Sequence, residues 1–250
     1  MDRRGLTGVV ALGAVLLAGA AWAEGRRLEP LRGEAFGADG RLRYVESHEF
    51  QATIGGMRQV TVYRDASGRE IGRMEADHGR YRFAPVYRMV DLRHDTEETV
   101  RRDGSLVHVE ARSGDRVRRK VLQVNTGREV IVGPGFNEFI AAHWDRLLAG
   151  ETLVADFVIP GRLALVAFRI RHTPAGAPDG AHRFTVSADN AFLRLLAPEL
   201  TVAYDRDTRA LVAYEGPSNV NDERNKSQTV AIRFPGGRGQ DVAAMPGTQP

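Results

Sequence analysis

Short runs of alternating apolar and polar residues dominate the chain between positions 42 and 125. Residues 107–112 read Val-His-Val-Glu-Ala-Arg, the period of two that a strand with one buried and one exposed face produces. Turn-forming clusters of Asp, Ser and Gly separate such runs at residues 65–68, 103–104 and 113–115. The pattern predicts an antiparallel β-meander over this half of the chain.

The same alternation returns after residue 151. It predicts strands over residues 152–159, 166–171, 184–186, 200–204, 211–214 and 229–234. In the last strand we expect Val230, Ile232 and Phe234 to be buried. Alternating Pro and Gly residues between 173 and 180 indicate a surface loop, and a short helix is expected over residues 190–196 because Asn190 suits its N-cap.

One amphipathic helix is expected between the two sets of strands, over about residues 134–149. Pro134 suits the first helical turn and Gly150 the end. The apolar side of this helix is formed by residues at spacings of three and four, namely Phe136, Phe139, Ile140, His143, Trp144, Leu147 and Leu148. We expect this stripe to pack against the sheet.

These elements predict a mainly β protein, a curved antiparallel sheet or half-barrel with one central amphipathic helix. Pro85 lacks an amide donor and suggests a bulge or an edge that helps the sheet to curve. The composition shows no shift that would mark a second domain. We therefore expect a lead-in over residues 24–40, a single β-rich domain over 41–235 and a flexible tail over 236–250.

Residues 1–23 have the features of a secretory signal peptide. Two arginines precede an apolar stretch, and Ala21-Trp22-Ala23 forms a small-residue cleavage site. We expect cleavage after Ala23 and a periplasmic protein that is not an integral membrane protein once processed. The chain has no cysteine, which excludes disulfides and zinc–thiolate sites and leaves the core to stabilise the fold.

The charge balance argues against a nucleic-acid-binding protein. After removal of the signal peptide, 33 basic and 31 acidic residues remain, whereas such proteins show a clear basic face. The exception is a cationic hairpin over residues 101–120, which is interpreted either as a solvated strand face or as a contact surface for an anionic envelope component. The candidate contact residues are Arg116, Arg118, Arg119 and Lys120.

No catalytic or metal-binding motif is present. The seven histidines form no H-x-H or H-E-x-x-H spacing, so no metal site and no cofactor are expected, although a site assembled from distant strands stays open. No G-x-S-x-G motif places a nucleophile on a strand-to-helix turn. His143 lies within the apolar stripe of the helix, where it is either a hydrogen-bonded, neutral core residue or a ligand-contacting or catalytic one.

The stretches at residues 133–140, 144–151 and 211–219 resemble those of a group of uncharacterised exported bacterial β-rich proteins. The resemblance covers most of the mature chain and implies no activity and no functional residues. In layout, a signal peptide followed by a long antiparallel meander and an amphipathic helix is similar to the periplasmic lipoprotein carriers (Lol). These carriers are curved half-barrels that bind acyl chains, which implies a binding role.

We therefore expect a periplasmic, non-enzymatic carrier or binding protein for an apolar or amphipathic, lipid-like molecule. The residues expected to line its site are Tyr81, Phe83, Tyr87, Met89, Phe136, Phe139, His143 and Trp144. Two alternatives remain open. One is a hydrolase that uses His143 or His94 with an acid on a neighbouring strand, and the other is an envelope scaffold that binds no small ligand.

Overall fold

A computed structural model describes residues 30–124, 127–190 and 199–235. The predicted signal peptide with its cleavage site, the tail over 236–250 and all but the first residue of the helix expected over 190–196 lie outside these residues. No helix in the described ranges combines the length and apolar character needed to cross a membrane.

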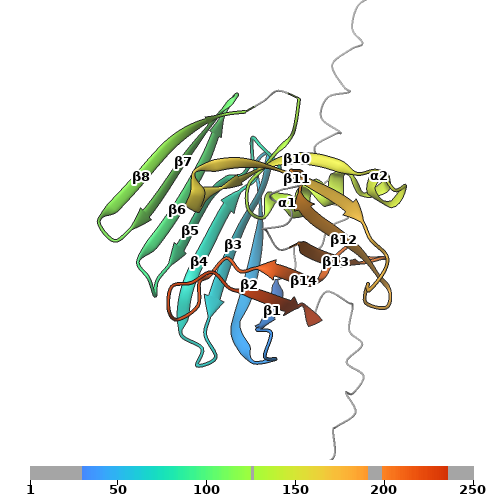
Figure 1. Ribbon diagram of the computed structural model, residues 1–250, viewed down its shortest axis with the longest axis horizontal. Coiled ribbons are helices and arrows are strands. Elements are labelled where there is room, and N and C mark those ends of the chain that lie inside the picture. Colours follow the sequence, from blue (N-terminus) through green and yellow to red (C-terminus); the bar gives the residue numbers. More distant parts are fainter. Residues whose placement is uncertain (1–29, 125–126, 191–198, 236–250) are drawn as a thin grey trace, which may run out of the picture.

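Within the described residues, fifteen strands form one sheet in the order β8-β7-β6-β5-β4-β3-β2-β1-β15-β14-β13-β12-β11-β10-β9 (Figure 1). The first half comprises β1 (Leu31–Phe36), β2 (Leu42–Thr53), β3 (Gly56–Arg64), β4 (Glu70–Asp77), β5 (Val86–Asp91), β6 (Thr96–Asp103), β7 (Leu106–Ser113) and β8 (Arg116–Gln123). The second half comprises β9 (Val130–Ile131), β10 (Leu153–Ile159), β11 (Ala164–His172), β12 (Ala181–Ala188), β13 (Leu200–Asp205), β14 (Leu211–Pro217) and β15 (Thr229–Arg233).

The sheet consists of two antiparallel meanders that are joined by the pairing of β1 with β15. Among the strands of the described residues, only β9 runs parallel to its neighbour, β10. β1 lies within the segment that was expected to be a lead-in, and its burial alternates because Gly33 and Ala35 face inward. The predicted turns at residues 65–68, 103–104 and 113–115 are confirmed.

The sheet is strongly curved, so that the β10–β11 connection reaches strands of the first meander (Figure 1). This connection is a short 3-10 helix, η1 (Pro160–Arg162). Arg118 on β8 donates a hydrogen bond to the Gly161 carbonyl at 2.8 Å. Leu163 and Leu165, which follow η1, pack against the buried residues of the first meander. The prediction of a mainly β protein built on a curved antiparallel sheet is confirmed.

Two apolar clusters fill the inner side of this sheet. The first is built mainly on β1–β8 and β15, with Tyr44, Tyr63 and Ile71 among its fully buried side chains. The second lies between the helical segment and β10–β13, around Trp144 and Phe184. Because alternate residues of each strand face inward, the period of two in the sequence is what supplies both clusters.

The predicted single helix is two shorter helices, α1 (Gly135–Ala142) and α2 (Trp144–Leu148). The break is at His143, whose φ of −109° and ψ of 18° leave the helical region. α1 lies against β9 and α2 against β11, and the break lets one apolar stripe follow both surfaces. Trp144 and Leu147 are buried as expected.

The segment before β5 also differs from the expectation. Tyr81 and Phe83 share a parity with Tyr87, yet β5 begins only at Val86. Residues 79–85 form a connection in which the Phe83 carbonyl accepts a hydrogen bond from the amide of Val132 at 2.9 Å. Pro85 therefore ends this connection rather than forming a bulge within a strand, because it offers no amide for a ladder.

Candidate functional site

The eight residues predicted to line a ligand site do not surround one space. Tyr87 and Met89 belong to the first apolar cluster, and Phe139 and Trp144 to the second. Phe83 and Phe136 pack at the margin of the second cluster and Tyr81 at the margin of the first. The rings of Phe83, Phe139 and His143 do meet, with a Phe83–Phe139 centroid distance of 5.6 Å and a Phe139–His143 distance of 4.5 Å.

Two open hollows lie side by side at one end of the first meander, and we call them together the rim hollow. The smaller, of about 280 Å³, lies between the 80–84 connection and residues 128–130. The larger, of about 580 Å³, extends from that connection to the β2–β3 turn and the end of β6. Both are lined by Arg80, Tyr81, Ala84 and Arg102. Of the predicted site residues, Tyr81 and Phe83 contribute to this lining.

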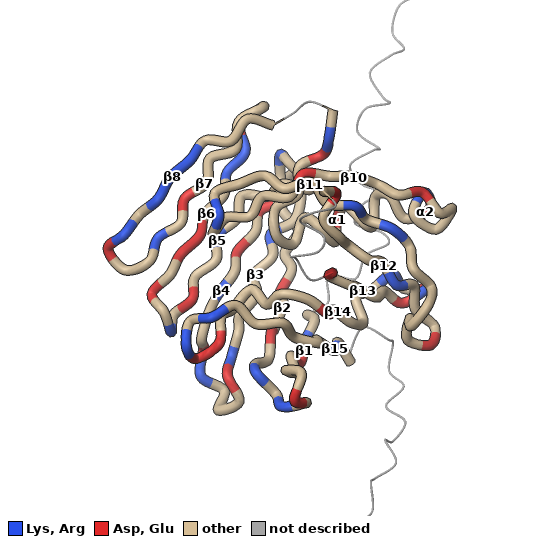
Figure 2. The backbone as a smooth tube through the Cα atoms, viewed as in Figure 1, with Lys and Arg blue, Asp and Glu red and all other residues tan. Residues whose placement is uncertain are grey.

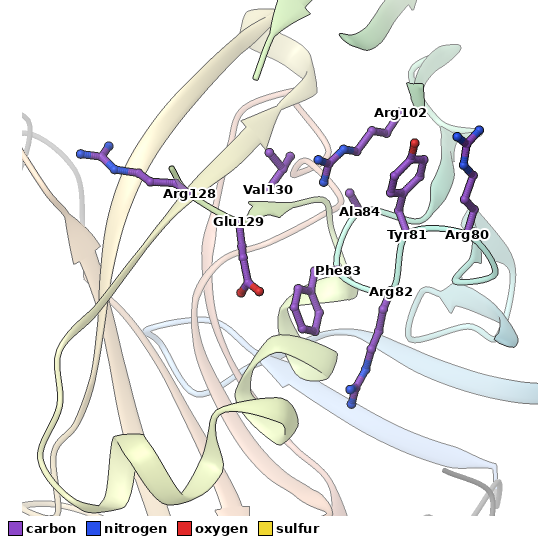
Figure 3. A pocket seen from close by; sticks show the side chains of 9 residues that line it. All are labelled: Arg80, Tyr81, Arg82, Phe83, Ala84, Arg102, Arg128, Glu129 and Val130. Carbon is purple, nitrogen blue, oxygen red and sulfur yellow. The ribbon is translucent and has the colours of Figure 1, made fainter. Parts of the chain in front are cut away.

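Tyr81 lies between two guanidinium groups at the centre of the rim hollow (Figure 3). The Arg102 Cζ atom is 4.7 Å from the centroid of the Tyr81 ring and that of Arg80 is 5.1 Å from it. The Tyr81 hydroxyl accepts a hydrogen bond from the Gly104 amide at 2.8 Å, and Arg102 Nε donates to the Gly104 carbonyl at 3.1 Å. The Tyr81 ring attracts both guanidinium groups. This attraction offsets part of the repulsion between their two positive charges.

The cations of the rim hollow differ in how far carboxylates neutralise them. Arg80 lies 3.5 Å from Asp103, both largely exposed, and Arg128 lies 3.4 Å from the more buried Asp156. Arg101 and Arg102 form no ion pair with any residue in the described part of the chain. Arg101 and Arg102 are therefore the guanidinium groups available to a ligand, although the carboxylates of Asp77 and Asp103 also line the larger hollow.

The larger hollow also carries apolar side chains that the protein leaves exposed. Ile54 at the β2–β3 turn is fully exposed, and Val86 at the start of β5 is 55% exposed. Apolar side chains beside unpaired guanidinium groups form an amphipathic surface. The sequence signal for this surface was weak, since Arg101 and Arg102 belong to an arginine-rich hairpin and Ile54 is a single apolar residue in a turn.

His143 is a half-buried residue that lies beside a carboxylate. Its Nε2 atom lies 2.9 Å from Oε2 of Glu129, and Arg146 Nη1 lies 3.4 Å from its Nδ1 atom. Since an arginine only donates, Nδ1 accepts and Nε2–H donates to the carboxylate. His143 therefore links α1 and α2 to the segment before β9.

His94 has a comparable structural role. Its Nε2–H donates to the backbone carbonyl of Asp222 at 2.8 Å, and Arg93 bonds to the carbonyl of Asn221. These bonds hold the β14–β15 connection over one end of the first meander, where Ser218 donates to the Tyr44 hydroxyl and Asn219 to that of Tyr63. Neither histidine suggested for a hydrolase is placed beside a hydroxyl nucleophile in the described residues.

A buried polar group on the inner face of β2 and β3 was not singled out from the sequence. His48 Nε2 lies 2.9 Å from Glu46 Oε1, and its Nδ1 lies 2.9 Å from Thr61 Oγ1 and 3.1 Å from Gln59 Nε2. Burial and the Glu46 carboxylate together raise the pKa of Tyr44, Tyr63 and Tyr214 far above its ordinary value. Thr61 is fully buried, so this group stabilises the interior and offers no access to a substrate.

The cationic residues proposed as an anion contact all lie on β8, the outermost strand of the first meander (Figure 2). Arg119 pairs with Glu110 at 2.6 Å on the outer face, whereas Arg118 bonds to Gly161 on the inner side. Arg116 and Lys120 are exposed. Among the described residues, no cluster of three or more His, Asp or Glu side chains is arranged to hold a metal ion.

No protein-family model and no curated protein sequence matches the chain. Among solved structures, the chain is similar to a β-barrel-like protein of the domain of unknown function DUF1849 from Brucella abortus. The two share 9% sequence identity at a TM-score of 0.46, over 84% of this chain and 96% of that one.

Proposed function

We propose that this chain is a periplasmic, non-enzymatic binding protein or carrier for an amphipathic molecule with an anionic group, which it holds in the rim hollow. The observation that supports this proposal best is the pair of guanidinium groups on either side of Tyr81, next to the exposed Val86. The anionic group would bind to Arg102, and it would replace the exposed Asp103 carboxylate as the partner of Arg80. The apolar part would cover Val86 and Ile54.

The chemistry of arginine favours an anionic ligand at this position. A guanidinium group offers several N–H donors in one plane and binds phosphate, sulfate or carboxylate oxygens in pairs. Arg102 has no carboxylate partner among the described residues, and its Nε–H is already used by Gly104. The N–H groups on its two terminal nitrogens are therefore available to an acceptor on a ligand.

The size and position of the rim hollow fit a small amphiphile. The larger hollow of about 580 Å³ falls within the range of roughly 300–1,000 Å³ that is usual for small-molecule sites. Since packed side chains occupy the two apolar clusters, the acyl-like part of a ligand would lie along the rim. This differs from the site lined by aromatic residues of the sheet and the helix that the sequence predicts.

Calorimetric titration with two single-chain amphiphiles below their micelle concentrations tests the proposal. Dodecyl phosphate should bind to the full chain, and the zwitterionic dodecylphosphocholine should bind more weakly. Arg102→Gln should weaken dodecyl phosphate binding roughly tenfold, because a charge-assisted hydrogen bond contributes about 1.5–3 kcal/mol. Arg41→Gln, a matched change in the exposed β1–β2 turn at the opposite end of β2, should have no effect.

The same titrations can reject the proposal. Equal affinity for the two amphiphiles would show that the anionic group is not recognised. An unchanged affinity in both Arg102→Gln and Arg80→Gln would place any binding elsewhere on the molecule.

A further inference from the structure

Two histidines that lie far from the rim hollow come together on neighbouring strands. His172 ends β11, where it pairs with Phe184 of β12, and His182 lies two residues before Phe184. The two side chains therefore share one face of the sheet, and the His182 ring meets that of Trp144 in α2. The Nδ1 atom of His182 is 3.3 Å from the Nε2 atom of His172, and the ring centroids are 5.1 Å apart.

This separation is the one that a shared metal ion requires. Imidazole nitrogens bind zinc at about 2.0–2.1 Å, so two of them at a tetrahedral angle lie roughly 3.3–3.4 Å apart. The observed distance of 3.3 Å matches this value. Without a metal ion the two nitrogens share a hydrogen bond, so a bound ion would take the place of the proton between them.

We propose that His172 and His182 together bind a divalent late first-row transition metal ion, with Cu²⁺ bound most tightly. Imidazole is a good ligand for copper, nickel and zinc, and the usual order of affinities places Cu²⁺ first. No third His, Asp or Glu side chain joins the pair within the described ranges. Water or an external ligand therefore completes the coordination, and the ion is exchangeable.

The surroundings keep both rings available as ligands. Burial lowers the pKa of His172 and of His182, the neighbouring His172 lowers that of His182 further, and the positive charge of Arg206 lowers both. The lowered pKa favours the neutral form of each ring, and this is the form that binds metals. Both side chains remain partly exposed, so an ion reaches them from solvent.

Arg206 also provides a sharp test, because its charge repels a metal cation. Its removal by Arg206→Gln should strengthen Cu²⁺ binding several-fold. If the natural ligand of the pair were an anion, the same substitution would weaken binding. The direction of this effect separates the two kinds of ligand.

Trp144 offers a local signal for the experiment, since its ring centroid is 5.6 Å from that of His182. Titration of the full chain with Cu²⁺ should quench tryptophan fluorescence, and the copper electron paramagnetic resonance spectrum should show coupling to imidazole nitrogen. His182→Gln and His172→Gln should each weaken the affinity at least tenfold. His108→Gln, on the outer face of β7, should leave it unchanged.

Several outcomes would overturn the proposal. If the copper electron paramagnetic resonance spectrum of the wild-type protein shows no coupling to nitrogen, His172 and His182 are not the ligands. Unchanged copper affinity in the double variant assigns the binding to other groups. Thermal unfolding of each variant in the presence of a chelator tests whether the variant is folded without metal. The tenfold loss of Cu²⁺ affinity counts only in variants that unfold cooperatively.

Discussion

The backbone of Gly135 lies directly against the carbonyl group of Phe83. A Cβ atom on residue 135 would stand 2.6 Å from the Phe83 carbonyl carbon and would overlap the carbonyl oxygen. Gly133, at a φ of +47°, comes similarly close to the ring of Tyr87. The two glycines thus allow the start of α1 to pack closely against the connection that carries Tyr81. This packing positions one wall of the rim hollow.

Gly135→Ala should destabilise the protein by about 2–3 kcal/mol, because a methyl group would be forced against the backbone rather than against a flexible side chain. For a chain of this size, the expected fall in melting temperature is roughly 5–10 °C. Calorimetry measures it. Gly127→Ala is the control, since a Cβ there meets nothing within 4 Å. Equal melting temperatures for the two variants would contradict the account of this contact.

His48→Leu should lower the free energy of unfolding by about 3 kcal/mol, since it leaves the buried Glu46 carboxylate without its partner. Thr61→Val removes one hydrogen bond to the same ring and should cost only about 1 kcal/mol. Urea denaturation of both variants measures the difference. Similar losses of unfolding free energy in the two variants would mean that the Glu46–His48 contact stabilises the protein no more than the Thr61 hydrogen bond does.

Glu98→Gln should stabilise the protein at neutral pH. Burial raises the pKa of Glu98 above its ordinary value of 4.5, although Arg118 opposes this. Between the ordinary and the raised pKa, the folded state binds more protons than the unfolded state, so wild-type stability falls as pH rises through that window. The advantage of the variant should therefore grow from pH 4 upward and then level off.

Urea denaturation of wild type and Glu98→Gln at a series of pH values between 4 and 8 measures this trend. Glu49→Gln, at an exposed position on β2, controls for the loss of one negative charge. An advantage that stays constant across the series would refute the assignment of the effect to Glu98.

Trp144→Ala should cost about 3–5 kcal/mol, because it empties a large buried volume beside Phe184 and Tyr204. Trp144 is 4% exposed and its ring meets those of both neighbours. Arg209→Ala removes the cation above the Trp144 ring and its exposed ion pair with Asp145 at 3.9 Å, and it should cost about 0.5–1 kcal/mol. Chemical denaturation compares them, and a loss below 1 kcal/mol for Trp144→Ala would show that this cluster is not a structural core.

The sequence alone determined the type and sidedness of most elements. Alternation over residues 107–112 predicted β7 and its buried Val107 and Val109, and the turn clusters predicted where hairpins reverse. This works because a period of two depends only on the pleat of one strand. The helical stripe likewise identified Trp144 and Leu147 as buried anchors.

Only the tertiary structure decided which elements meet. The pairing of β1 with β15 joins segments about 200 residues apart, and no local pattern encodes a partner at that distance. The break at His143 follows from two separate packing surfaces. The sandwich of Tyr81 between Arg80 and Arg102 and the approach of His172 to His182 depend on register and curvature, and these are set by contacts summed over the whole sheet.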